Sequence, residues 1–375
     1  MYRNHSIGVV IPAYNEAGFV GDVIETVPEY VDRVYVIDDG STDGTWEEMQ
    51  AASERVNEDE HASNSQHPNF DRRVVPIRHE RNRGVGGAIK TGYQRARDDR
   101  INVTAVMGGD GQMRPSALSS FLDPIVEGRA DYTKGNRLIE TETRAGMPQF
   151  RKVGNYILSG LTKIASGYWG IGDPQNGYTA ISLQALDTIE LDEMYEFYGY
   201  CNDILVKLNV HDLRVEDVPR KCNYADEESH IDYKTYIPRV SGMLLRNFVW
   251  RLREQYLRGS FHPAALCYTI GMTTGLVGTL LAGAEAASNG RQSRGVGNAI
   301  KTTLVGGIVF LAGTVFERKR HESLASASDP EPELSQEAAV EEPPVEATVE
   351  SPQPAEPTEN GAETPVAQDG QSETS

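Results

Sequence analysis

The first 130 residues alternate short apolar runs with longer segments in which apolar residues recur at helical spacing. The apolar runs predict four buried strands, at residues 7–11, 34–37, 73–77 and 101–106. The segment 17–30 is the first of the amphipathic helices that follow these strands. This alternation is typical of a parallel sheet covered by helices on both faces, so we expect an α/β fold.

Polar side chains follow three of the four predicted strands. Because the carboxyl ends of parallel strands meet at one edge of a sheet, where ligands bind, we expect these side chains to form a nucleotide and metal site. Carboxylate and amide oxygens suit a hard divalent cation that keeps water ligands and shares phosphate oxygens. The residues concerned are Asn15 and Glu16, Asp38 and Asp39, and Asp110 and Gln112.

The glycine-rich segment 82–93 completes neither of two common nucleotide-binding motifs. Its Gly84-Val85-Gly86 resembles the start of the dinucleotide fingerprint, but Ile89 occupies the position of the third glycine. The same isoleucine stands where a phosphate-binding loop ending in Lys90-Thr91 needs its last glycine. Both motifs are therefore excluded.

Four segments of the chain resemble, in order, the motifs of family 2 glycosyltransferases, which have a GT-A fold. The resemblance covers roughly residues 6–230, and within the family the chain looks like the dolichyl-phosphate mannose and glucose synthases and their polyprenyl-phosphate relatives. It implies a mostly parallel sheet with helices on both faces. The segments are Ile11-Pro-Ala-Tyr-Asn-Glu16, Asp38-Asp-Gly-Ser-Thr-Asp-Gly-Thr45, Asn82-Arg-Gly-Val-Gly-Gly-Ala88 and Gly108-Gly-Asp-Gly-Gln112.

The resemblance assigns six residues to the nucleotide of a nucleotide-sugar donor. Three of them would line the base and ribose, one would contact the base, and two would lie near the nucleotide at the start of a helix, where backbone amides can face an anion. In that order they are Pro12, Tyr14 and Glu16, then Asp39, then Arg83 and Gly84.

The resemblance also implies a divalent cation, Mg²⁺ or Mn²⁺. Asp110 matches the second aspartate of the family's DxD motif, and Gln112 matches a further metal ligand of this branch. Gly108 occupies the first position of the motif, so the chain has one carboxylate fewer than the family pattern.

Basic residues mark the acceptor side. A strand is expected at 131–135, and Arg137 after it matches a family arginine placed near phosphate groups. Arg144, Arg151 and Lys152 flank a helix of about 17 residues that starts near residue 150. Clustered cations of this kind suit a polyprenyl phosphate acceptor or a leaving diphosphate.

Asp173 lies where the family carries a carboxylate proposed as a catalytic base or as a group that positions the acceptor. The competing interpretation is a residue that caps a helix or turn. With Asp110 as the residue that holds the metal, Asp173 completes the pair of residues expected to take part in catalysis.

The C-terminal part of the chain predicts membrane attachment. Residues 232–262 combine apolar positions with arginines, as in a basic amphipathic helix at the headgroup level. Two apolar segments, about 264–284 and 299–316, are expected to span the membrane, so that residues 263–317 form a transmembrane pair. Basic residues flank this pair more densely than they occur within it, which places the catalytic domain (1–231) and both termini in the cytoplasm of a multi-pass cell-membrane protein.

The net charge of −19 arises mainly in the C-terminal segment. From His321 onward there are 14 acidic and no basic residues, so residues 1–320 carry 41 acidic against 36 basic residues, about −5. Residues 318–375 are expected to be a disordered acidic tail. The chain has no basic patch interleaved with aromatic residues, so nucleic acid is not an expected partner. The acidic, lysine-poor composition fits a halophile, and together with the resemblance it suggests archaeal protein glycosylation.

These observations predict a membrane-bound, inverting glycosyltransferase. It would move a hexose from UDP- or GDP-hexose to dolichyl or polyprenyl phosphate, or to a lipid-linked glycan, for protein N-glycosylation or cell-surface glycan synthesis. If the acceptor is a phosphate, Asp173 would position it; if it is a sugar hydroxyl, Asp173 would act as a base. The alternatives are a catalytically impaired GT-A membrane scaffold, prompted by Gly108, and a nucleotidyltransferase.

Overall fold

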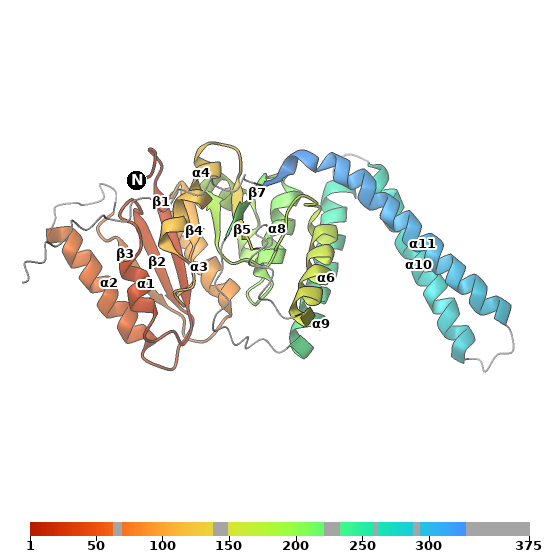
Figure 1. Cartoon of the computed structure of the whole chain (residues 1–375), viewed down its shortest axis with the longest axis horizontal. Helices are drawn as coiled ribbons and strands as arrows, with labels where there is room; N and C mark the ends of the chain where they lie inside the picture. The colour runs from red at the N-terminus through yellow and green to blue at the C-terminus, as the bar shows by residue number, and fades with distance from the viewer. Residues whose placement is uncertain (63–69, 138–148, 221–232, 258–261, 288–292, 328–375) are drawn as a thin grey trace, which may run out of the picture. The chain divides into compact units, whose positions relative to one another are not determined.

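The computed structural model describes residues 1–62, 70–137, 149–220, 233–257, 262–287 and 293–327. Within them the strands form one sheet in the order β3-β2-β1-β4-β6-β5-β7-β8, and every neighbouring pair is parallel except the two pairs that include β6 (Figure 1). The strands are β1 (Ile7–Ala13), β2 (Arg33–Asp38), β3 (Val74–Arg78), β4 (Val103–Val106), β5 (Tyr132–Asn136), β6 (Thr179–Ser182), β7 (Val215–Pro219) and β8 (Ala325–Ala327).

Helices cover both faces of the sheet because its central strands are apolar on both sides. In β1, the side chain of Val10 belongs to one core cluster, and those of Val9 and Ile11 belong to the other. The first cluster includes α3 (Val85–Asp98), α7 (Leu183–Thr188) and α8 (Tyr200–Val210), and the second includes α1 (Val20–Glu25), α2 (Thr45–Ala62) and α4 (Leu118–Val126). Burial of each such side chain contributes roughly 1.5–3 kcal/mol. The predicted α/β architecture of a GT-A fold, mostly parallel with helices on both faces, is confirmed.

A third cluster joins α8 to two further helices, α6 (Gln149–Ser166) and α9 (Tyr233–Leu252). After α9 the chain makes one π-helical turn, Arg253–Leu257. Two long apolar helices follow, α10 (Pro263–Ala287) and α11 (Ser293–Arg320), and they contain the segments predicted to span the membrane.

The helices α10 and α11 pack against each other as an antiparallel hairpin (Figure 1). A Cβ on Gly271 would lie 2.5 Å from the backbone nitrogen of Phe310, and one on Gly278 would lie 2.5 Å from that of Thr303. Only glycine permits such close approach of two helices. Segments of both helices, 263–285 and 295–320, are long and apolar enough to cross a membrane, with mean hydropathies of 1.5 and 1.7.

The prediction that residues 318–375 are disordered is wrong for their first ten residues. The helix α11 continues to Arg320, a 3-10 turn spans Glu322–Leu324, and β8 then joins the sheet as a parallel neighbour of β7. Leu324 and Ala325 pack against the core cluster that contains Val10 and Tyr168, and the acidic composition of the segment does not reveal this burial. The remaining residues, 328–375, lie outside the described residues.

Candidate active site

The loops after β1 and β4 lie side by side at the carboxyl edge of the sheet. The backbone N–H of Gly109 donates to the carbonyl oxygen of Pro12 (3.1 Å), and a Cβ on Gly109 would lie 3.1 Å from that of Ala13. This contact brings Glu16 into the neighbourhood of Asp110. Burial, followed by the charge of Asp110, raises the pKa of Glu16 to about 6.

The loop 14–16 is anchored to the segment after β2. Asn15 has a positive φ of 56°, its backbone N–H donates to Ser41 Oγ (2.9 Å), and its side-chain oxygen accepts from Thr42 N (2.9 Å). The backbone N–H of Glu16 donates to Thr45 Oγ1 (2.8 Å). Tyr14, which was predicted to line the base and ribose, is 45% exposed at this edge.

Asp110 projects beside a position that has no side chain. Its Oδ1 accepts from the backbone N–H of Gln112 (3.1 Å), and among the described residues no basic group pairs with it. A Cβ on Gly108 would lie 3.0 Å from that same oxygen. Glycine at position 108 therefore both removes a carboxylate and leaves space for the carboxylate of Asp110.

Metal binding fits this donor set if the substrate supplies part of the coordination. No group of three or more His, Cys, Asp or Glu side chains in the described part of the chain is arranged around a common point. Mg²⁺, however, keeps several waters and is commonly held by one or two carboxylates together with phosphate oxygens. The Asp110 carboxylate and the exposed Gln112 amide match that pattern.

Asp39 is buried and holds the start of α3. Its carboxylate accepts from the backbone N–H groups of Arg83 (2.9 Å) and Gly84 (2.7 Å), and it pairs with His79 Nδ1 (2.7 Å). The Arg83 and Gly84 amides, expected to face a nucleotide anion, thus already face the Asp39 carboxylate. A carboxylate at a helix N-terminus is stabilised by the unpaired amides and the helix dipole.

The glycines of the 82–88 motif have a packing role. A Cβ on Gly86 would lie 2.3 Å from the carbonyl oxygen of Tyr195, and one on Gly84, whose φ is +89°, would lie 2.6 Å from that of Glu196. The Glu196 carboxylate pairs with Arg83 (2.5 Å) and with Lys90 (3.2 Å). These contacts bring the loop before α8 against the start of α3.

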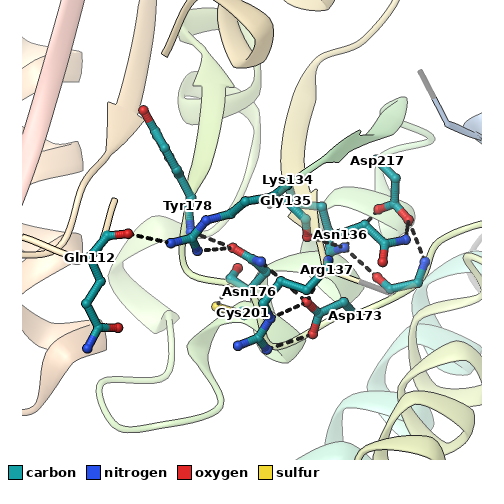
Figure 2. A network of polar contacts seen from close by, with 12 residues as sticks. Gln112, Lys134, Gly135, Asn136, Arg137, Asp173, Asn176, Tyr178, Cys201 and Asp217 are labelled. Atoms are coloured by element: carbon teal, nitrogen blue, oxygen red, sulfur yellow. Dashed lines mark hydrogen bonds and ion pairs between the residues drawn. The ribbon is translucent and has the colours of Figure 1, made fainter. Parts of the chain in front are cut away.

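Asp173 and Arg137 form a bidentate ion pair on the acceptor side (Figure 2). Arg137 Nε donates to Oδ2 of Asp173 (2.7 Å), and Nη2 donates to Oδ1 (3.0 Å). The carboxylate also accepts from the backbone N–H of Arg137 (3.2 Å), and Asp173 is only 4% exposed. Burial opposes its ionisation, but the hydrogen bonds and charge of Arg137 outweigh burial and hold the pKa of Asp173 below its usual range.

A second buried ion pair lies beside the first and was not foreseen from the sequence. Lys134 Nζ lies 2.8 Å from Oδ1 of Asp217, whose other oxygen accepts from Asn136 Nδ2 (2.7 Å) and from the backbone N–H of Gly172 (2.6 Å) (Figure 2). The available signal was the lysine within a predicted buried strand. Its partner on β7 is 83 residues away in the chain.

Arg220 connects the predicted metal side to the acceptor side. Its Nη2 donates to the carbonyl oxygen of Gln112 (3.0 Å), and its Nη1 donates to Oδ1 of Asn176 (3.3 Å). Asn176 Nδ2 in turn donates to Oδ2 of Asp173 (3.3 Å). Figure 2 shows the resulting chain of contacts between Gln112 and Asp173. No motif marks Arg220 or Asn176 in the sequence.

Three predicted acceptor-side cations cannot be placed. Arg144 and the side chains of Arg151 and Lys152 lie outside the described residues. The described part of the site nevertheless joins Asp110 and Gln112 to Arg137 and Asp173 at one edge of the sheet.

The sequence was compared with protein-family models and with curated proteins. A model described as glycosyl transferase family 2 matches residues 8–190. UDP-N-acetylglucosamine–dolichyl-phosphate N-acetylglucosaminyltransferase of Methanococcus voltae is 31% identical over 221 residues, which cover 59% of this chain and 86% of that protein. Dolichol-phosphate mannosyltransferase of Pyrococcus furiosus is 27% identical over 50% of this chain and 49% of its own length. Glycosyltransferase AglJ of Haloferax volcanii is 26% identical over a region that covers 63% of this chain and 65% of that protein.

Proposed function

Because this chain belongs to glycosyl transferase family 2 and is a hexosyltransferase, we propose that it transfers a hexose from a nucleotide sugar to a dolichyl or polyprenyl phosphate, with inversion. Two of the related proteins are named for transfer to dolichyl phosphate, which supports the acceptor class. The role in protein N-glycosylation belongs to the same proposal, as does the choice between UDP- and GDP-hexose as donor.

The Arg137–Asp173 ion pair favours a phosphate acceptor over a sugar hydroxyl. A hydroxyl acceptor needs a base whose pKa lies near the working pH. Asp173 is unsuited to that task, because Arg137 occupies both of its oxygens and lowers its pKa. A phosphate monoester, with a second pKa near 6, is already ionised at neutral pH and needs no base.

In this mechanism Asp173 orients Arg137. The bidentate contact fixes the plane of the guanidinium. A planar guanidinium held in this way is suited to bind a phosphate. Asn176 and Arg220 link the Asp173 carboxylate by hydrogen bonds to the carbonyl oxygen of Gln112, in the loop that carries Asp110. The acceptor phosphate oxygen would then attack the sugar from the side opposite the leaving diphosphate.

The donor side would bind Mg²⁺ or Mn²⁺ through Asp110 and Gln112. When bound, such a cation neutralises the charge that develops on the leaving diphosphate. Tyr14, Pro12 and Glu16 border the same edge and are proposed to contact the nucleotide. The anchored loops after β1 and β2 keep these residues beside Asp110 before the donor arrives.

A lipid acceptor agrees with the hairpin of α10 and α11, which favours attachment to a membrane. We place the catalytic domain on the cytoplasmic side because arginines flank the hairpin at both ends. That orientation also gives the enzyme access to cytoplasmic nucleotide sugars.

The test is an assay of the membrane-embedded protein with labelled UDP- and GDP-hexoses and a short polyprenyl phosphate. We expect a labelled polyprenyl-phosphate sugar and release of nucleoside diphosphate. Transfer only to a lipid-linked glycan would overturn the choice of acceptor. In a separate reaction that supplies a nucleoside triphosphate and a hexose 1-phosphate, formation of a nucleotide sugar with release of inorganic diphosphate would indicate a nucleotidyltransferase. Donor binding without transfer to any lipid would indicate a scaffold.

Metal use is tested in the same assay. Treatment with EDTA should abolish transfer, and Mg²⁺ or Mn²⁺ should restore it. Asp110→Asn should raise the metal concentration needed for half-maximal activity by about tenfold or more, because one charged ligand is lost. Full activity of the EDTA-treated enzyme would exclude a role for the cation.

A further inference from the structure

The loop 167–172 joins α6 to Asp173, and its first residue packs against Arg251 of α9 and against His321, which follows α11. Gly167 has a φ of +79°, and a Cβ there would lie 2.8 Å from Arg251 Nη1 and 2.9 Å from His321 Nδ1. Arg251 lies at the end of α9, whereas His321 directly follows α11. The start of the loop thus lies between one residue from the helix that precedes the hairpin and one residue that directly follows the hairpin.

The middle and the end of the same loop are held by the last two strands. A Cβ on Gly170 would lie 3.0 Å from the carbonyl oxygen of Ala325, the first residue of β8. The backbone N–H of Gly172 donates to Asp217 on β7 (2.6 Å). Figure 2 shows Asp217 beside Lys134 and Asn136, next to the Arg137–Asp173 pair.

The residues that follow α11 pack into the catalytic domain. β8 pairs with β7 in parallel, with Ala327 opposite Asp217. Leu324 and Ala325 pack against the core cluster that contains the fully buried Tyr168 and Ile171 of the loop. The segment 321–327 thus lies close to the loop at Gly167 and Gly170, and it packs against the same core cluster as Tyr168 and Ile171.

We infer that the segment 321–327, which follows the second candidate membrane span, is a positioning element for the acceptor side of the active site. It holds the loop 167–172 and thereby the orientation of Asp173 and of the Arg137 guanidinium. The catalytic domain is incomplete without this segment, although it lies more than 100 residues after β7. The inference rests on the proposed function only for its kinetic consequence.

The first test compares two truncations of the full chain in membranes. A chain ending at Pro330 keeps β8, and a chain ending at Arg320 lacks it. We expect the longer chain to keep its activity, and the shorter one to lose at least tenfold in kcat/KM for polyprenyl phosphate with an unchanged KM for the nucleotide sugar. An equal loss of kcat/KM for the nucleotide sugar and for polyprenyl phosphate would indicate general destabilisation and would overturn the inference.

Hydrogen exchange gives a readout that does not depend on transfer. In the chain ending at Arg320, the amides of residues 168–172 should exchange at least tenfold faster, while those of β1 and β4 keep their rates. Unchanged exchange in the loop would reject the inference even if the proposed function is correct. Absence of transfer by the intact chain, with the exchange result as expected, would instead reject the proposed function alone.

A point variant covers the case in which the shorter chain does not fold. Gly170→Val places a side chain against the Ala325 backbone, whereas Gly160→Val on α6 enters space with nothing within 4 Å of the added Cβ. We expect the first to reproduce the acceptor-specific loss and the second to retain activity. Normal acceptor kinetics in Gly170→Val would contradict the inference.

Discussion

On the acceptor side, the carboxylate of Asp173 and the guanidinium of Arg137 have different roles in the proposed mechanism. Asp173 is buried, accepts three hydrogen bonds from Arg137, and has a lowered pKa. A group in that state orients its partner and remains ionised at neutral pH. Arg137 keeps part of its surface in contact with solvent, where a phosphate can reach it.

Asp173→Asn should lower kcat/KM for polyprenyl phosphate by about 100-fold, an effect of roughly 3 kcal/mol at the lower end of the range for broken buried pairs, because Arg137 is partly solvated. Asp131→Asn is the matched control, since Asp131, the residue before β5, pairs in the same bidentate manner with Arg214, the residue before β7. An equal loss of acceptor kinetics in both variants would refute a specific role for Asp173.

The pH dependence separates positioning from base catalysis. Because the pKa of Asp173 is lowered in the folded protein, the stabilisation by the pair is present above the unfolded value near 3.9 and is lost only as the pH falls through the folded value. The activity ratio of wild type to Asp173→Asn should therefore stay constant between about pH 5.5 and 8. A ratio that falls in the acidic part of this range would identify Asp173 as a base.

The space beside Asp110 leads to a prediction for Gly108→Ala. The added Cβ would lie 3.0 Å from Asp110 Oδ1, so the carboxylate has to move by a few tenths of an ångström. We expect the Mg²⁺ concentration for half-maximal activity to rise several-fold, about 1 kcal/mol in binding free energy. Gly160→Ala, which meets open space, should leave it unchanged. If the Mg²⁺ concentration for half-maximal activity did not change in Gly108→Ala, the space beside Asp110 would not be needed for metal binding.

At the scale of elements, the glycines of the apolar hairpin determine how closely α10 and α11 approach. Gly306 and Gly307 are neighbours in α11 but face different surroundings. A Cβ on Gly306 would lie 2.3 Å from the backbone nitrogen of Gly275, whereas one on Gly307 has nothing within 4 Å. The two positions therefore form a matched pair for testing the contact.

Gly306→Ala should destabilise the protein in detergent by about 1–3 kcal/mol, because the methyl group forces two backbones apart. Gly307→Ala should be neutral or slightly stabilising, because alanine favours a helix more than glycine does. Thermal unfolding followed by circular dichroism measures both. Equal stability of the two variants would mean that the hairpin does not pack as described.

At the scale of the whole molecule, a buried polar cluster joins the catalytic domain to the hairpin. Arg251 and Glu317 are an ion pair with both side chains 0% exposed. Arg251 also donates to the carbonyl oxygens of Ala165 (2.8 Å) and Ile164 (3.0 Å) at the end of α6, and Glu317 accepts from Tyr268 on α10 (2.7 Å).

Glu317→Gln or Arg251→Met alone should destabilise the protein by about 3–5 kcal/mol, because each leaves an uncompensated buried charge. The double variant should lose less than the sum of the two single losses, since the pair is removed together. Chemical denaturation in detergent measures the three variants, and strict additivity would show that the two groups do not interact.

The sequence by itself determined the α/β fold, the glycosyltransferase class, the hairpin and the loop that carries Asp110, because these depend on local periodicity, strand-end chemistry and contiguous motifs. Only the tertiary structure showed that Asp39 faces the helix amides and that Asp173 is paired with Arg137. It also revealed Lys134, Asp217 and Arg220, and it corrected the start of the predicted tail. Each of these contacts joins residues that are tens to more than a hundred positions apart in the chain and become neighbours only when the sheet forms. No local sequence pattern encodes that proximity.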